Sequence, residues 1–414
     1  MLLPFRRLFI LAKDPLKQRA AWELMKFLHD HGVKGYVAFN TLIFTKELPD
    51  AEKQLHLLED SGVDAVIVQD LGLARMVKAL TPKLRLHAST QMTITSPEGL
   101  EFAKQLNIDQ AVLARELSMR ELERFKAAAV PLEVFVHGAL CVAYSGQCLT
   151  SESLGRRSAN RGECAQACRM PYEMIVDGEP RDLEDKRYLL SPQDLAAVDE
   201  IPRLIELGIR SFKIEGRLKT PEYVAGVTQV YRKAIDRALA NQPAPASEAD
   251  RYALEMTFSR GLYPGWMHGV NHQELVGAYY GKKRGPYVGQ VTRIIDDDTL
   301  ELDELHIAMK PGDGVLTEQC QGYTPQRHGT IYSCQRAHDE ANQAQRVRSL
   351  LMPFIAKGFF QIDRLQAHPG QMGPPFFAGS FGDMQGVWRH QLRHFVDVAT
   401  RSLSCRWHAI GPAT

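Results

Sequence analysis

The sequence lacks long apolar runs and an excess of charge of either sign. Its first residues, MLLPFRRLFILAKD, interrupt short apolar pieces with Pro4, Arg6 and Arg7, so they form neither a secretory signal nor a membrane span. The 50 Lys and Arg residues nearly balance the 49 Asp and Glu residues, which leaves a net charge of +1. Any binding of nucleic acid must therefore come from a local patch. We expect a cytoplasmic protein with no membrane partner.

Several catalytic motifs are also missing. There is no HExxH zinc site, no P-loop and no glycine fingerprint for dinucleotides. A G-x-S-x-G nucleophile elbow is absent as well, because Ala143 replaces the first glycine before Ser145. A Cys–His pair of Cys141 with His137 or His87 is conceivable, but it would leave three neighbouring cysteines unused.

Helical and β-rich segments alternate from about residue 15 to 240. Seven β-rich runs are expected: GYVAFNTL, VDAVIVQD, LRLHAST, QAVLAREL, LEVFVHG, RYLLS and RSFKIEG. Continuous apolar runs between helices indicate a parallel sheet that is buried on both faces. The pattern predicts an α/β fold, a TIM-like (β/α) barrel that lacks its first βα unit. The run RRLFILA is only a weak candidate for an extra strand.

The pattern of residues changes after this alternating region. We assign residues 1–241 to the barrel, with a cysteine loop at 138–170, and residues 242–282 to a linker with a helical or loop connection. Short alternating runs punctuated by Gly and Asp predict a small antiparallel β domain over 283–355. Residues 356–414 show no clear periodicity and are assigned no fold.

Polar residues follow several of the expected strands, at the edge of the barrel where functional groups gather. Each could simply cap a helix or contact solvent in a loop. Taken together, they provide a candidate substrate ligand, Asn40, and six candidate catalytic residues: His87, Gln91, Glu116, His137, Lys213 and Glu215.

Four of the seven cysteines lie within 28 residues, in the pattern C-x6-C-x15-C-x3-C: Cys141, Cys148, Cys164 and Cys168. The first follows the run LEVFVHG, which places it at the carboxyl end of a strand. Four thiolates can hold a [4Fe–4S] cluster or a tetrahedral zinc ion. Structural zinc usually has two short cysteine pairs and only one is present, so the spacing favours iron. Zinc and unligated cysteines remain alternatives.

Basic residues surround the cysteines and open the β domain. Guanidinium groups bind phosphate or carboxylate in bidentate fashion. They could equally offset the negative charge of a thiolate-bound cluster. The candidate substrate-binding residues are Arg156, Arg157, Arg161, Arg169, Lys282, Lys283 and Arg284.

These segments resemble the collagenase-like peptidase family. The resemblance lies in EVFVHGALC (133–141), in the run GRRSANRGECAQACR (155–169), and in the blocks HASTQ, NTLIF and FKIEGRLKTPEYV. FSRGLYPGW followed by KKRGPYVGQV is most similar to the branch that makes 5-hydroxycytidine in large-subunit ribosomal RNA.

The resemblance implies a [4Fe–4S] cluster on the four cysteines, RNA as the partner, and prephenate as the oxygen donor. The expected activity is hydroxylation of RNA, giving 5-hydroxycytidine in 23S rRNA or modifying a related tRNA nucleotide. The alternatives are a collagenase-like peptidase and a non-catalytic RNA-binding module. Family members open with an additional βα stretch, which agrees with the count of seven strands.

Overall fold

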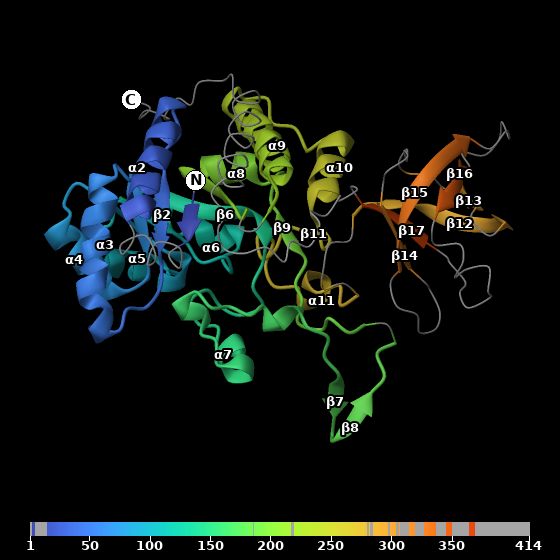
Figure 1. Ribbon diagram of the computed structural model, residues 1–414, viewed down its shortest axis with the longest axis horizontal. Coiled ribbons are helices and arrows are strands. Elements are labelled where there is room, and N and C mark those ends of the chain that lie inside the picture. Colours follow the sequence, from blue (N-terminus) through green and yellow to red (C-terminus); the bar gives the residue numbers. More distant parts are fainter. Residues whose placement is uncertain are drawn as a thin grey trace.

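A mostly parallel sheet forms the centre of the protein (Figure 1). The computed structural model describes residues 2–4, 15–184, 186–216, 219–279, 281, 285–296, 299–303, 306, 314–318, 327–336, 345–349 and 364–368. Its main sheet contains Leu2–Pro4 (β1), Tyr36–Phe39 (β2), Ala65–Val68 (β3), Arg85–Ala88 (β4), Gln110–Val112 (β5), Leu132–Ala139 (β6), Asp194–Ala196 (β9), Ser211–Ile214 (β10) and Leu262–Tyr263 (β11).

Strands β1 to β6 pair side by side in chain order, all parallel. Strand β6 pairs in parallel with β10 as well as with β5. The last residues of β6 pair with β9 in the antiparallel direction, and β11 pairs with β9. The carboxyl ends of β2 to β5 therefore meet at one edge of the sheet.

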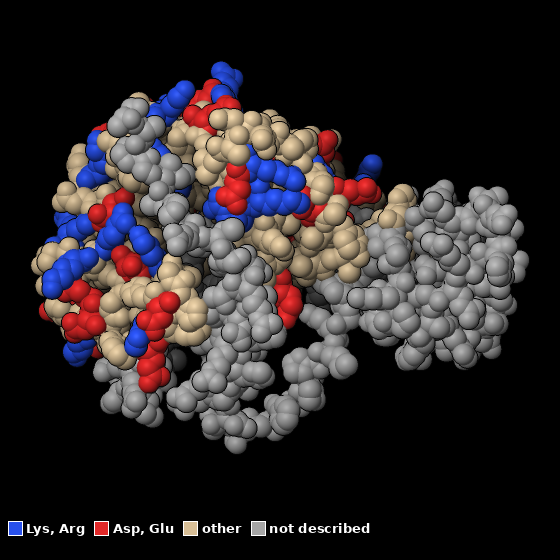
Figure 2. All heavy atoms as spheres, turned by 90° about the horizontal axis from the view of Figure 1, so that it is seen from above, with Lys and Arg blue, Asp and Glu red and all other residues tan. Residues whose placement is uncertain are grey.

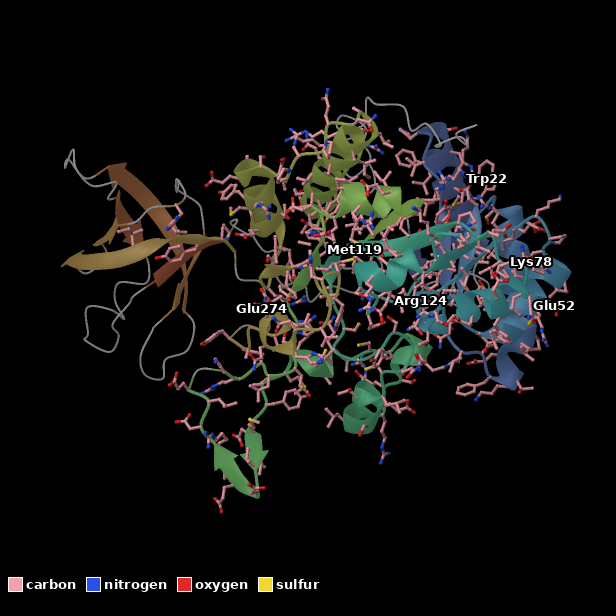
Figure 3. All side chains as sticks on the ribbon, turned by 180° about the vertical axis from the view of Figure 1, so that it is seen from behind. Trp22, Glu52, Lys78, Met119, Arg124 and Glu274 are labelled. Carbon is pink, nitrogen blue, oxygen red and sulfur yellow. The ribbon has the colours of Figure 1, made fainter. Side chains whose placement is uncertain are left out.

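Helices connect and cover these strands. They are Pro15–Asp30 (α2), Leu48–Asp60 (α3), Leu71–Leu80 (α4), Pro97–Lys104 (α5), Met119–Glu123 (α6), Thr150–Gly155 (α7), Ile201–Glu206 (α8), Pro221–Leu239 (α9), Glu248–Thr257 (α10) and His272–Leu275 (α11). Short 3₁₀ turns occur at Thr45–Glu47 (η1), Thr90–Met92 (η2), Ala159–Arg161 (η3) and Ala167–Arg169 (η4). Trp22, Glu52 and Lys78 mark α2, α3 and α4, which flank one end of the sheet (Figure 3).

Local sequence signals explain where the helices begin. Asp70 accepts a hydrogen bond from the Leu73 amide at the start of α4, and Ser96 and Thr220 cap α5 and α9 in the same way. All four residues of β3 are buried, as expected for a central strand covered on both faces. No helix in the described part combines the length and apolarity that a membrane span requires.

The prediction of an α/β fold with a mostly parallel sheet is confirmed, but closure into a TIM-like barrel is not. Among the described strands, β1 pairs only with β2, and no pairing joins it to β10. The prediction of a strand at RYLLS is wrong, because the strand of this region is β9, which begins three residues after that run ends. RRLFILA lies outside the described residues.

Two smaller β units complete the described chain. Met174–Val176 (β7) and Glu179–Arg181 (β8) form a hairpin that projects from the body (Figure 1). Six antiparallel strands pair in a closed ring, with β17 beside both β12 and β14. They are Tyr287–Asp296 (β12), Thr299–Asp303 (β13), Gly314–Glu318 (β14), Arg327–Arg336 (β15), Gln345–Ser349 (β16) and Arg364–His368 (β17). The last strand, β17, falls in the segment to which the sequence assigned no fold.

Candidate functional site

The cysteine loop, residues 138–170, leaves the end of β6 through a glycine that no other residue could replace without strain. Gly138 has φ +105°, and an added Cβ would lie 2.8 Å from both Cβ and the carbonyl oxygen of Glu215. Glu215 follows β10, so the loop starts in direct contact with the neighbouring strand end.

A second anchor fixes the loop at Ser145. Its amide and its hydroxyl both donate to Oε1 of Glu116, at 2.8 and 2.9 Å, and its carbonyl oxygen accepts from Thr93 Oγ1 at 2.7 Å. The next residue, Gly146, has φ +81°, and a Cβ there would collide with the carbonyl oxygen of Gln91. The predicted catalytic residues Gln91 and Glu116 therefore lie against the loop.

Arg161 provides a third anchor and does not project toward the thiols. Its guanidinium binds both carboxylate oxygens of Glu47, at 2.6 and 2.9 Å, donates to the Leu42 carbonyl oxygen, and stacks on Phe44 at 4.4 Å. Burial raises the pKa of Glu47, but the hydrogen bonds from Arg161 and the Phe44 amide, with the charge of Arg161, together outweigh it and the net shift is downward. The interaction attaches the loop to the segment after β2.

Arg169 is also committed to the protein itself. It donates to Ser191 Oγ at 2.8 Å, to the Leu140 carbonyl oxygen at 2.6 Å, and to the Pro192 carbonyl oxygen. These contacts join the end of the loop to its beginning. Of the four predicted arginines in the loop, only Arg156 and Arg157 remain exposed to solvent.

The four cysteines of the loop are all free thiols. Cys141 and Cys164 are exposed, while Cys148 and Cys168 are half-buried. Burial raises the pKa of the Cys168 thiol, Arg169 opposes this, and the other three thiols raise it further. Cys168 therefore lies close enough to the other three thiols for their charges to affect it.

Hydrogen-bond donors surround two of these sulfurs. Arg115 Nη1 lies 3.7 Å from Cys141 Sγ, and Cys164 Sγ accepts from the Gln166 amide at 3.4 Å and from Ser151 Oγ at 3.8 Å. Hydrogen bonds to sulfur are a recurring feature of iron–sulfur sites. No three His, Cys, Asp or Glu side chains in the described part are grouped tightly enough for one metal ion. Four thiols on one loop are a donor set that could hold either a [4Fe–4S] cluster or a zinc ion.

A band of buried polar atoms lies at the ends of β2 to β5. Unpaired buried groups of this kind each cost about 1–3 kcal/mol, so a concentration of them is typical of a binding site. Side chains in the band with a buried nitrogen or oxygen atom that no described residue hydrogen-bonds are Thr41, Gln69, His87, Gln91, Arg115 and Glu116. The cysteine loop passes over this edge, since the Leu42 amide after β2 donates to the Asn160 carbonyl oxygen (3.0 Å).

Deeper in the sheet, Lys213 forms an ion pair that the sequence did not predict. Its Nζ lies 2.9 Å from Glu133 Oε1, and Glu133 Oε2 accepts from Ser211 Oγ at 2.6 Å and Gln110 Nε2 at 2.8 Å. The signal was a glutamate near the start of the mostly apolar run LEVFVHG. Burial lowers the pKa of the nearby His87 to about 4, so this imidazole is neutral at pH 7.

His137 points away from the loop and packs against α9. Its Nδ1 lies 3.3 Å from the Tyr231 hydroxyl, and its ring contacts both Tyr231 and Tyr223. Burial lowers its pKa to about 3. The pairing of β6 with β10 shifts register beside His137, an irregularity that the alternation of residues in the sequence did not reveal.

The remaining predicted residues are more dispersed. Glu215 pairs with Arg115 at 3.4 Å, and the Arg115 guanidinium stacks on Phe135 at 3.8 Å. Asn40 is half-buried directly after β2. Lys282, Lys283 and Arg284 lie outside the described residues.

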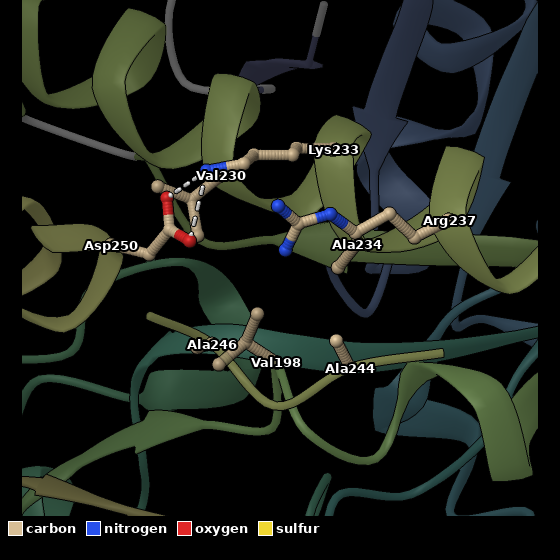
Figure 4. A pocket seen from close by; sticks show the side chains of 8 residues that line it. All are labelled: Val198, Val230, Lys233, Ala234, Arg237, Ala244, Ala246 and Asp250. Carbon is tan, nitrogen blue, oxygen red and sulfur yellow. Dashed lines mark hydrogen bonds and ion pairs between the residues drawn. The ribbon is translucent and has the colours of Figure 1, made fainter. Parts of the chain in front are cut away.

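A small pocket elsewhere in the protein offers no comparable chemistry. It lies between α9 and the segment that leads into α10, where Lys233 and Asp250 face each other (Figure 4). These two side chains form an ion pair at 2.9 Å, so their charges are satisfied within the protein, and Arg237 lines the pocket beside them.

Four free thiols, on a loop anchored over the carboxyl edge of a parallel α/β sheet, define a candidate metal or redox centre of an enzyme. The chain belongs to peptidase family U32, whose family model matches residues 11–277. It is 37% identical over 295 residues to a 23S rRNA 5-hydroxycytidine synthase of Escherichia coli, covering 69% of this chain and 44% of the relative.

Two further relatives carry different names. A tRNA hydroxylation protein P1 of Bacillus subtilis is 33% identical over 308 residues, covering 71% of this chain and 72% of that protein. A collagenase of Porphyromonas gingivalis is 31% identical over 349 residues, covering 79% and 82%. The predicted family is confirmed, and with it an enzyme of that family.

Proposed function

We propose that this enzyme hydroxylates RNA, producing 5-hydroxycytidine in 23S rRNA or a related modified nucleotide in tRNA. The observation that carries the proposal is the four-thiol loop held over a band of buried, unpartnered polar atoms. Relatives named for rRNA and tRNA hydroxylation support it. The alignment with the E. coli synthase spans less than half of that protein, so its specific substrate is part of the proposal.

Cys141, Cys148, Cys164 and Cys168 would hold a [4Fe–4S] cluster, which supplies electron transfer when bound. In the overall exchange, a C–H bond of the base becomes C–OH, and a hydroxylated donor gives up its OH and gains the hydrogen. The base loses the two electrons that the donor gains, so the exchange balances without molecular oxygen. We propose prephenate as this donor.

The residues of the strand edge would orient the base and the donor. One carboxylate oxygen of Glu116 accepts a hydrogen bond from Ser145, and the other is buried without a described partner. Neutral His87, Gln69 and Gln91 add further polar atoms at the same edge. Such groups can pair with the edge of an unstacked base.

The test is a nucleoside analysis of ribosomal and transfer RNA. Cells that lack the gene should lose one hydroxylated pyrimidine nucleoside, and the wild-type gene should restore it. A Cys164→Ala gene should not restore it, because the cluster would lack a ligand. If deletion leaves every hydroxylated nucleoside at its wild-type level, the proposal is wrong.

A peptidase is the second candidate, favoured by the relative named a collagenase. Its obvious nucleophile, Ser145, donates its hydroxyl hydrogen bond to Glu116 and accepts from the Arg115 amide at 3.4 Å. Ser145→Ala should therefore remove the hydroxyl hydrogen bond to Glu116 and lower the free energy of unfolding by about 1 kcal/mol. RNA hydroxylation should remain largely intact. Gelatin cleavage by the pure protein that resists chelators and disappears in Ser145→Ala would instead favour the peptidase.

A further inference from the structure

The outer surface of the cysteine loop combines exposed apolar side chains with arginines that have no acidic partner. Tyr144 and Leu149 are each 64% exposed, and Leu154 is 63% exposed. All three lie within residues 144–154 of the loop, and exposed apolar side chains of this size can serve as contacts for a ligand. The loop is otherwise firmly anchored, so this exposure is not that of a detached segment.

Two arginines accompany these apolar residues. Arg156 ends α7 in the left-handed conformation, φ +53°, and forms no side-chain hydrogen bond or ion pair within the described part of the chain. Arg157 donates from Nε to the Glu163 carbonyl oxygen at 3.1 Å and pairs with no described carboxylate. Both charges are therefore available to a ligand, unlike those of Arg161 and Arg169.

Two other regions are less suited to a polyanion. On the face shown in Figure 2, basic and acidic side chains are interspersed and form no broad positive area. The β7–β8 hairpin region carries five acids over residues 173–184, Glu173, Asp177, Glu179, Asp182 and Glu184, against one base, Arg181. A nucleic acid would be repelled there and attracted to the neighbouring loop.

We propose that the outer surface of the loop, Tyr144 with Arg156 and Arg157, is a platform for single-stranded RNA beside the thiols. Single-strand binding combines basic groups along the backbone with aromatic rings on which bases stack. Tyr144 is exposed and lies three residues from Cys141 in the chain, so a base stacked on its ring would lie close to the thiols. This inference rests on the proposed function and specifies how its substrate is held.

The test separates phosphate contacts from stacking. Binding of a short fluorescent single-stranded RNA to the anaerobically purified full chain is measured at several salt concentrations. Arg156→Gln/Arg157→Gln should reduce the salt slope by about 1.4, at roughly 0.7 per lost phosphate contact. Tyr144→Ala should weaken binding about tenfold without changing the slope, and Tyr144→Phe should bind like wild type.

The matched control is Arg75→Gln/Arg210→Gln, which removes two exposed arginines, one on α4 and one at the amino end of β10. It should bind RNA like wild type. Unchanged affinity and slope in the loop variants would overturn the platform, and so would loss of iron from Arg156→Gln/Arg157→Gln. If the nucleoside persists in gene-deleted cells, the proposed function fails as well. If the loop variants bind RNA like wild type but the nucleoside is lost in gene-deleted cells, the proposed hydroxylation is retained and RNA binds at another surface of the protein.

Discussion

Replacing any one ligand cysteine should remove the iron from the anaerobically purified protein. We expect the wild-type chain to be brown and to contain about four irons. Alanine at one position exposes the cluster to solvent and oxidation, so the colour should be lost. The measurement is iron content together with the visible absorption spectrum, for Ala variants of Cys141, Cys148, Cys164 and Cys168.

The control is Cys334→Ala, since this cysteine lies far from the loop in the sequence. It should retain its iron. Zinc at one ion per chain, with no iron in anaerobic preparations, would contradict the prediction. The four variants should also remain folded, because the contacts of Arg161 with Glu47 and of Ser145 with Glu116 anchor the loop independently of any metal.

The sequence predicted the parallel strands well because their signal is local. A run such as VDAVIVQD is apolar on both faces, and the structure buries every residue of β3. The cysteine motif could also be recognised from the sequence, because recognising it requires only the residue types and their spacing along the chain. Closure of the sheet is different, because it depends on pairing between distant strands, and no single segment encodes it.

The roles of individual side chains were harder to predict. The position of His137 at the end of an expected strand suggested that it lies in the site, but its ring packs against Tyr231, beside a register shift between β6 and β10. Arg161 sits three residues from Cys164, yet a partner 114 residues away, Glu47, holds it. Such interactions depend on the three-dimensional approach of separate elements.

The largest effect on stability is expected from the buried pair of Lys213 and Glu133. Lys213→Met should lower the free energy of unfolding by about 3–5 kcal/mol, because it leaves a buried carboxylate without its cation. The two side chains are only 11% and 7% exposed, so water cannot replace the lost partner. Urea unfolding at pH 7 measures the loss, and Lys26→Met, at an exposed pair with Asp30, should change little.

The dependence on pH identifies the carboxylate as the cause. In the wild-type protein burial raises the pKa of Glu133, but the charge of Lys213 and the hydrogen bonds from Lys213 and Ser211 together outweigh it, and the net shift is downward. The pair therefore stabilises the fold above the unfolded pKa, and this contribution is lost as the pH falls. Without Lys213, burial is opposed mainly by the hydrogen bonds from Ser211 and Gln110, so we expect the folded pKa to rise. The variant should then be weakest at neutral pH, and its deficit should shrink toward pH 4. Adding Glu133→Gln to Lys213→Met should recover much of the loss at pH 7. An equal deficit at both pH values, unrelieved by the second substitution, would mean that packing of the lysine stem is responsible.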